Sequence, residues 1–200
     1  LSTPDGNLII DCGEGFQSRL IKHELDLKNN PIGIRARFSK IKVILLTHSH
    51  LDHCWGILPL LKTMQLDGRQ QPLTIIAPST PQAIEWAEKN YRETIPDNYD
   101  INPSDFAFLF KEWRSHINNS RKKMFKINWI LIPINGQNSH DIPLQPIKGI
   151  KLTAIPTKHT VVSVAWLISS IEKPDRSVLI SGDTKYNGIS FKKEILEKPV

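Results

Sequence analysis

Short apolar segments recur along the chain, separated by polar residues, glycine or proline. Segments of this kind that are rich in β-branched side chains are typical of buried strands. We predict strands over residues 7–11, 42–47, 73–77, 128–134, 150–155, 161–169 and 177–181.

Apolar residues spaced three or four positions apart predict helices between some of these strands. One such stretch follows His53, with Ile57, Leu60, Leu61 and Met64 on one face. A second begins at Thr80, which suits the N-cap, with Pro81 at the first helical position. Residues 104–117 and 189–198 also have helical spacing, and the first places Phe106, Leu109, Phe110, Trp113 and Ile117 on one face. Strands that alternate with helices predict a layered α/β protein with the sheets inside.

Length and composition indicate an ordinary globular protein. Two hundred residues suit one core, and no linker divides them, so we expect a single domain over residues 1–200. No apolar stretch has the length needed to span a bilayer, and no signal peptide stands at the start, so we expect no membrane partner. Two cysteines are too few for a disulfide scaffold, which favours the cytoplasm. Because the chain opens at Leu1 and enters a strand almost at once, we expect an N-terminal piece to be missing.

The positive charge is concentrated in one segment. The whole chain carries a net charge of +6, and residues 111–126 hold six basic residues against one acidic residue. A basic patch of this kind attracts polyanions through counterion release. A solvated loop explains the same composition, and the sequence alone does not separate the two readings.

The segment "THSHLDH" (47–53) has the densest chemistry in the chain. It places His48, His50, Asp52 and His53 within six positions, directly after a predicted strand. Imidazole and carboxylate groups are the usual nitrogen and oxygen ligands of zinc. His48 and His50 can converge on one ion, and Asp52 and His53 can reach a second. A pair of such ions suits the hydrolysis of a phosphoester or a related ester, whereas a chance run in a loop would not explain four such residues after a strand.

Two other strand ends carry matching side chains. His159 and Asp183 each follow a predicted strand, and they can meet the histidine segment at one sheet edge if the strands lie side by side. Ligand histidines need acceptors that fix the ring tautomer. Asp11, at the end of the first strand, is a candidate for that supporting role, and a simple turn-forming role is the alternative.

These segments together resemble a known family. "THSHLDH" is the HxHxDH motif of the metallo-β-lactamase fold, and "IDCGEGFQSRL" (10–20) resembles the opening motif of ribonuclease Z. "LLKTMQLDGRQQPLTIIAP" (60–78) and "HTVVSVAWLI" with "LISGDT" resemble later regions of that family. The resemblance implies a four-layer αββα sandwich, here lacking N- and C-terminal pieces. It also implies a zinc-dependent endoribonuclease that removes the 3′ trailer from precursor tRNA, and self-association into a homodimer.

The resemblance assigns roles residue by residue. One zinc would be held by His48, His50 and His159, the other by Asp52 and His53, and Asp183 would bridge the two. Asp52 would also be the catalytic residue that orients or deprotonates the attacking water.

Two departures from the family change what we expect. Only 24 positions separate His159 from Asp183, which leaves no room for the arm with which many members grip tRNA. Arg121, Lys122 and Lys123 are then candidates for RNA binding, and Trp113 for stacking on a base. The family's last histidine ligand has no match before Val200, so we expect one zinc to bind firmly and the second weakly, unless a residue such as His140 completes the second site.

Two other functions fit the same motifs. A small-molecule phosphodiesterase on the same fold, of the cyclic-nucleotide or arylsulfatase-like kind, would also carry the HxHLDH pattern. A non-catalytic, metal-stabilised RNA-binding module would use the basic segment as its working surface. Assays with small phosphodiesters, cyclic AMP and precursor tRNA separate the three.

Overall fold

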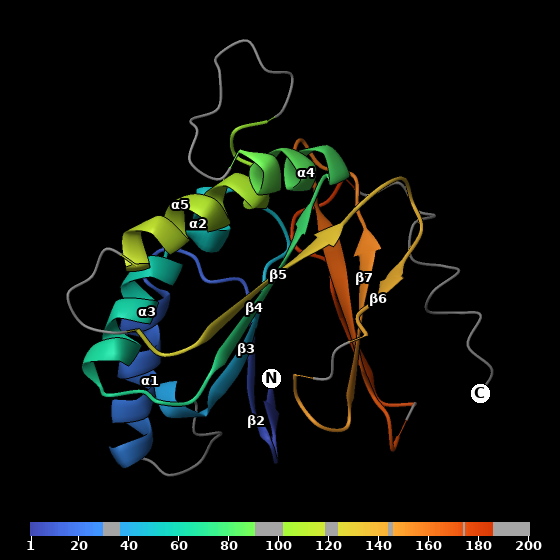
Figure 1. The fold of residues 1–200 in the computed structure, drawn as a ribbon. Coiled ribbons are helices and arrows are strands. Elements are labelled where there is room, and N and C mark those ends of the chain that lie inside the picture. The colour runs from blue at the N-terminus through green and yellow to red at the C-terminus, as the bar shows by residue number, and fades with distance from the viewer. Residues whose placement is uncertain (30–36, 91–101, 119–123, 144–145, 174, 186–200) are drawn as a thin grey trace.

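Two β-sheets pack face to face, and helices cover the outer face of one of them (Figure 1). The computed structural model describes residues 1–29, 37–90, 102–118, 124–143, 146–173 and 175–185. Within these residues, no helix is long and apolar enough to cross a membrane. The predicted helix over residues 189–198 lies outside them.

The first sheet is mostly parallel. Its order is β1 (Ser2–Thr3), β2 (Gly6–Ile10), β3 (Ile41–Leu45), β4 (Leu73–Ser79) and β5 (Ile127–Pro133). Only β1 runs antiparallel to its neighbour; β2 to β5 are parallel and so need crossover connections. The crossovers hold α1 (Phe16–Asn29), the 3-10 turn Phe38–Lys40, α2 (Leu51–Cys54), α3 (Ile57–Leu66), α4 (Pro81–Lys89) and α5 (Phe106–Asn118). The carboxyl ends of the parallel strands therefore share one edge, where the histidine segment begins.

The second sheet is antiparallel throughout. It consists of β6 (His140–Asp141), β7 (Ile150–Pro156), β8 (Val164–Ser170) and β9 (Ser177–Ile180), in that order. Every residue of β8 except the last is buried, which explains the apolar run in its sequence. The face of this sheet that points away from the first sheet carries an apolar cluster of Ile155, Ala165, Leu167 and Leu179. No helix among the described residues lies on that face.

The main cores lie on the two faces of the first sheet. One lies between this sheet and the helices, and the other lies between the two sheets. Trp166 of β8 is fully buried in the second core, and its indole N–H donates to the Leu46 carbonyl over 2.9 Å. This hydrogen bond fastens the second sheet to the residue that follows β3, close to the histidine segment.

The structure confirms the strands and most helices that the apolar spacing predicts. Thr80 caps α4 as predicted, because its hydroxyl accepts a hydrogen bond from the Ala83 amide over 3.2 Å. The helix α1 was not predicted. Its sequence is mostly polar, and Ile21 and Leu25 remain 40% and 52% exposed, so the apolar stripe that signals a helix is weak.

The expectation that Trp113 stacks on an RNA base is wrong. Trp113 is only 6% exposed and packs with Phe110 and Trp129, at ring-centroid distances of 5.8 and 6.2 Å. The helical spacing that places Trp113 on the same face as Phe106 and Phe110 also turns it toward the first sheet. Its indole is therefore part of the core and has no free face for a ligand.

Arg69 gives the "DGRQQPLTI" segment a structural role. Its guanidinium donates to the carbonyls of Phe38, Ile41, Gln71 and Pro72 over 2.7 to 3.0 Å. It also lies 5.2 Å from the centroid of the Phe125 ring. One side chain thus joins the starts of β3 and β4 to the segment before β5.

We expect Arg69→Ala to lower the free energy of unfolding by about 2–4 kcal/mol, because hydrogen bonds from a charged donor are lost together. Urea denaturation followed by tryptophan fluorescence measures the change. Arg19→Ala, on the exposed side of α1, is the matched control and should change the free energy by less than about 0.5 kcal/mol. Equal stabilities for the two variants would contradict the role of Arg69.

Candidate metal centre

The histidine segment is held in place by backbone contacts with both sheets. The Leu46 amide donates to the carbonyl of Ile76 in β4, and the Val164 amide of β8 donates to the Thr47 carbonyl, both over 2.9 Å. His48 forms an isolated antiparallel bridge with Ser163. The segment therefore lies at the seam between the sheets, where their side chains can meet.

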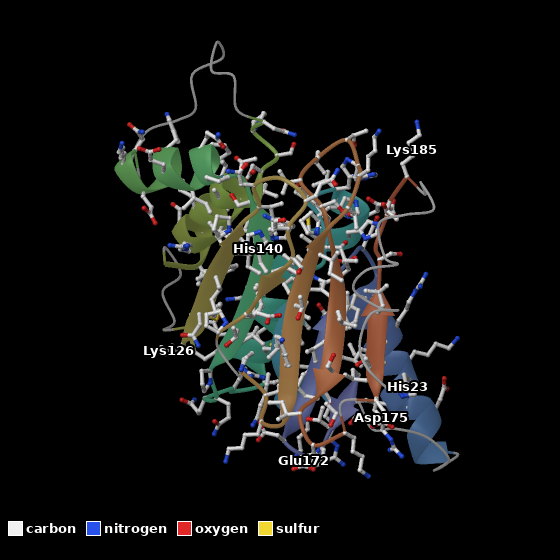
Figure 2. The ribbon with its side chains drawn as sticks, turned by 90° about the vertical axis from the view of Figure 1, so that its right-hand side faces the viewer. His23, Lys126, His140, Glu172, Asp175 and Lys185 are labelled. Atoms are coloured by element: carbon white, nitrogen blue, oxygen red, sulfur yellow. The ribbon has the colours of Figure 1, made fainter. Side chains whose placement is uncertain are left out.

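The strand ends that carry His159 and Asp183 reach the same seam. Lys185, two residues after Asp183, lies at the opposite end of the second sheet from Glu172 and Asp175 of the β8–β9 turn (Figure 2). The Lys185 amide donates to the Lys158 carbonyl over 2.8 Å, which brings the segments after β7 and β9 together. The sequence predicts that these strand ends meet the histidine segment at one sheet edge; they meet it instead across the seam between two sheets.

Three histidines form the first donor group. The Nδ1 atom of His50 lies 3.2 Å from Nε2 of His48 and 3.1 Å from Nε2 of His159. All three nitrogens lie within 4.8 Å of one another. His48 is fully buried, whereas His50 and His159 are partly exposed, so the group closes on the protein side and opens toward solvent.

A second donor group lies beside the first and shares His48 with it. It consists of His48, His53 and Asp183. Nε2 of His53 lies 3.5 Å from Oδ1 of Asp183 and 3.7 Å from Oδ2 of Asp52. Asp52 does not belong to either compact group, and its side chain is 77% exposed. The structure thus places Asp52 at the solvent edge of the second group.

Asp11 fixes the orientation of two of the histidines, His53 directly and His48 through Thr47. Its carboxylate receives hydrogen bonds from the Thr47 amide and hydroxyl, each over 2.8 Å, and faces Nδ1 of His53 over 2.7 Å. The Thr47 hydroxyl, having donated to Asp11, is left to accept from Nδ1 of His48 over 3.0 Å. Both rings are then protonated at Nδ1, which leaves the Nε2 lone pairs directed into the cluster.

The backbone of the "DCGEG" motif clamps the same loop. The Cys12 amide donates to the His53 carbonyl, and the Gly56 amide donates to the Cys12 carbonyl, over 2.7 and 2.8 Å. A Cβ atom on Gly13 would lie 1.8 Å from the Asp52 carbonyl oxygen, so only glycine allows this approach. Asp11 itself has a positive φ of 58°, which Asp tolerates better than most residues. The motif therefore serves as the support of the histidine loop.

The donor atoms fit a metal ion such as zinc. Tetrahedral Zn–N bonds place neighbouring ligand nitrogens about 3.3 Å apart, close to the spacings around His50 Nδ1. Burial, together with the imidazoles of His53, His159 and His50, lowers the pKa of His48 to about 4, so its ring is neutral at neutral pH. Burial acts to lower the pKa of His53, but the hydrogen bond and charge of Asp11 outweigh it and raise that pKa. Lone pairs that converge in this way are stabilised by a cation.

The cysteines and His140 lie outside both groups. Cys12 and Cys54 are buried free thiols, and burial raises the pKa of each to about 12, which makes them poor ligands. His140 lies on β6, where Figure 2 labels it, and neither donor group found among the described residues includes it.

Some site residues were missed by sequence reasoning, and others cannot be placed. Thr47 was missed, although its position directly before His48 was the available signal. The supporting role of Gly13 was missed because a close backbone approach leaves no trace in apolar spacing. Arg121, Lys122 and Lys123 lie outside the described residues.

Two sheets packed face to face, with a histidine and carboxylate cluster at their seam, define an α/β sandwich of the metal-binding class. The family model of the metallo-beta-lactamase superfamily matches residues 1–195, and the chain belongs to that superfamily. The predicted fold is therefore confirmed.

Individual relatives carry a more specific name than the superfamily. A protein named Ribonuclease Z from Aeropyrum pernix is 31% identical over 140 residues, which are 63% of this chain and 41% of the relative. A Ribonuclease Z from Saccharolobus islandicus is 33% identical over 167 residues, which are 84% of this chain and 40% of that protein. The chain thus spans less than half the length of these relatives.

Solved structures share the fold at low sequence identity. Human tRNase Z, short form, superposes with a TM-score of 0.61 at 18% identity, covering 92% of this chain and 60% of the other. The metallo-beta-lactamase fold protein YhfI from Bacillus subtilis gives a TM-score of 0.53 at 18% identity, covering 94% and 54%. At these identities the likeness concerns the fold alone.

Proposed function

We propose that this protein is a cytoplasmic, zinc-dependent phosphodiesterase, and in particular an endoribonuclease that removes the 3′ trailer from precursor tRNA. The observation that carries the proposal is the pair of adjoining donor groups that share His48. The similarity to proteins named Ribonuclease Z over 84% of the chain supports the choice of RNA as substrate. The homodimer that the resemblance implies is part of the same proposal.

The proposed roles combine the family resemblance with the positions of the side chains. His48, His50 and His159 would hold one ion, Asp52 and His53 would hold the other, and Asp183 would reach both. Zinc ions held in this way lower the pKa of a bound water and neutralise charge on a phosphate.

Asp52 would take the proton of the attacking water. Its carboxylate is 77% exposed yet lies 3.7 Å from His53, so it faces both solvent and the second donor group. Asp11 and Thr47 would keep the rings of His48 and His53 in the tautomer that binds metal.

A comparison of substrates tests the proposal. The zinc-loaded full-length protein is assayed with precursor tRNA, bis(p-nitrophenyl) phosphate and cyclic AMP. Cleavage of precursor tRNA at the trailer junction supports the proposal. Turnover of cyclic AMP without tRNA cleavage would favour a small-molecule phosphodiesterase, and tRNA affinity without any hydrolysis would favour a binding module.

We predict that replacing Arg121, Lys122 and Lys123 together with alanine weakens tRNA binding. Positive side chains that contact phosphates release counterions, so the slope of log affinity against log salt should also flatten by about 2 to 3. Fluorescence anisotropy over a range of salt concentrations measures both quantities. Hydrolysis of a small phosphodiester should hardly change, because protonated lysine and arginine side chains have no lone pair with which to ligate a metal ion.

The charge-matched control replaces Arg19, Lys22 and Lys62, which are exposed on α1 and α3. It removes the same positive charge from another part of the surface. If the two triple variants lose tRNA affinity equally, or if neither does, the basic segment is an ordinary solvated loop.

A further inference from the structure

A cavity of about 420 Å³ adjoins the metal centre. Ser49, which stands between His48 and His50 in the chain, and Thr160, which follows His159, both line it. The Thr160 hydroxyl lies 3.4 Å from Nε2 of His50, on the side of the ring away from the donor cluster. The cavity and the first donor group therefore share a wall.

The buried part of the cavity wall includes apolar side chains, and side-chain amides lie at its solvent-exposed edge. Pro78 and Phe106 are buried and give an apolar floor, and Val161 and Val162 add to it. Gln82 and Asn102 line the same cavity and are exposed, so their amides lie toward solvent. A cavity that combines apolar side chains with amides and hydroxyls suits a planar heterocycle whose own edge carries donors and acceptors.

The charges of the wall disfavour an anion. Among the described residues that line the cavity, Asp105 is the one charged side chain. Its carboxylate is 6% exposed and receives hydrogen bonds from the Ser79 hydroxyl, the Thr80 amide and hydroxyl, and the Ala107 amide. The N-cap of α4 and the first turn of α5 thus already bind a negative group, which disfavours a phosphate beside them.

The same contacts make the cavity rigid. Asp105 joins the end of β4 to the start of α5, with its shortest hydrogen bond of 2.6 Å to the Ser79 hydroxyl. A cavity held open in this way loses little conformational entropy when it binds a ligand.

We propose that this cavity binds the nucleobase of one of the two nucleotides that flank the scissile phosphodiester. The inference rests on the proposed nuclease function. The phosphate lies at the donor groups, the uncharged base enters the cavity beyond His50 and Thr160, and the amides of Gln82 and Asn102 meet its edge. The cavity thereby sets the position of the bond that is cut.

Abasic substitution tests the inference. A short RNA substrate is prepared with the base removed at each flanking nucleotide in turn, and kcat/KM is measured with the zinc-loaded full-length protein. Loss of stacking at one of the two positions should lower kcat/KM about tenfold or more. Binding of the same RNAs to the metal-free protein, measured by anisotropy, should show the same dependence.

Val161→Trp should fill the cavity, so it tests whether the loss of kcat/KM with abasic RNA depends on the cavity. This variant should cleave the intact RNA slowly and should show no further loss with the abasic RNA. Its hydrolysis of methyl p-nitrophenyl phosphate reports whether the donor groups still support chemistry. Val178→Trp, at a valine of β9 that is 44% exposed, is the matched control and should keep the abasic effect.

Gln82→Ala with Asn102→Ala is a milder second variant, for use if Val161→Trp does not fold. It leaves the space open and should reduce the preference among the four bases at the sensitive position. The inference is overturned if RNA is cut but neither abasic substitution lowers kcat/KM. It is also overturned if the abasic RNA still loses as much kcat/KM in the folded Val161→Trp variant as in the wild type. An unchanged base preference in the double variant overturns it as well. If the small ester is hydrolysed and no RNA is cut, the proposed nuclease function fails as well.

Discussion

Asp52→Ala is expected to abolish hydrolysis while leaving the fold intact. The side chain is 77% exposed at the start of the short helix α2, so its removal opens no cavity in the core. Its carboxylate is the proposed proton acceptor and lies 3.7 Å from Nε2 of His53. Loss of a catalytic base costs roughly 100- to 10,000-fold in rate, and loss of a ligand adds to this. Steady-state hydrolysis of bis(p-nitrophenyl) phosphate measures the effect.

The control separates chemistry from folding. Asp67→Ala removes an exposed aspartate at the end of α3 and should leave the rate unchanged. Circular dichroism should show the same melting curve for both variants and the wild type. The histidine group does not contain Asp52, so the variant should retain the zinc bound there. Turnover near the wild-type rate in a metal-loaded Asp52→Ala protein would refute the assignment.

Asp11→Asn should lower zinc affinity about 10- to 100-fold, although Asp11 belongs to neither donor group. The substitution keeps the shape of the side chain but replaces one acceptor oxygen with an N–H donor. The Asn side chain has one acceptor oxygen, so it cannot accept from both Thr47 and Nδ1 of His53 as the carboxylate does. The tautomers of His53 and His48 are then no longer fixed. Competition with a chromophoric chelator measures the affinity.

Asp5→Asn is the matched control for this prediction. Asp5 precedes β2, whereas Asp11 follows it, and the Asp5 carboxylate accepts from Lys42 over 2.6 Å. The control should bind zinc as the wild type does. Equal zinc affinity in Asp11→Asn and Asp5→Asn would show that Asp11 is only a turn-former.

The strands and helices were predictable where buried residues recur in a regular pattern along the sequence. The strands β3, β4, β7 and β8 have mostly apolar sequences because most of their residues are buried, and α3 shows its buried stripe directly. The two-residue strands β1 and β6 are too short to leave a pattern, and α1 has a polar sequence. Trp113 was misjudged because its aromatic character suggested a ligand, although its spacing from Phe110 indicated the core.

The donor cluster was predictable because its side chains all follow strands, although the strands belong to two sheets and their ends meet at the seam between them. That placement groups His159 and Asp183 with the histidine segment without knowledge of any distance. The support from Thr47 and Gly13, and the cavity bounded by Phe106 and Asp105, depend on how loops from distant segments pack. Such contacts have no period in the sequence, so only the structure reveals them.

The shared seam also has a consequence for biogenesis. Asp11 and the histidine segment leave the ribosome early, whereas His159 and Asp183 follow only after most of the described chain has been made. An ion can meet three donors of either group only once β8 has docked through Trp166 and Val164. Metal uptake is therefore a late step, unlike in zinc fingers, where the ion organises the chain. On the proposed zinc-dependent function, a cell short of zinc would accumulate the folded apoprotein, and added zinc would restore its activity.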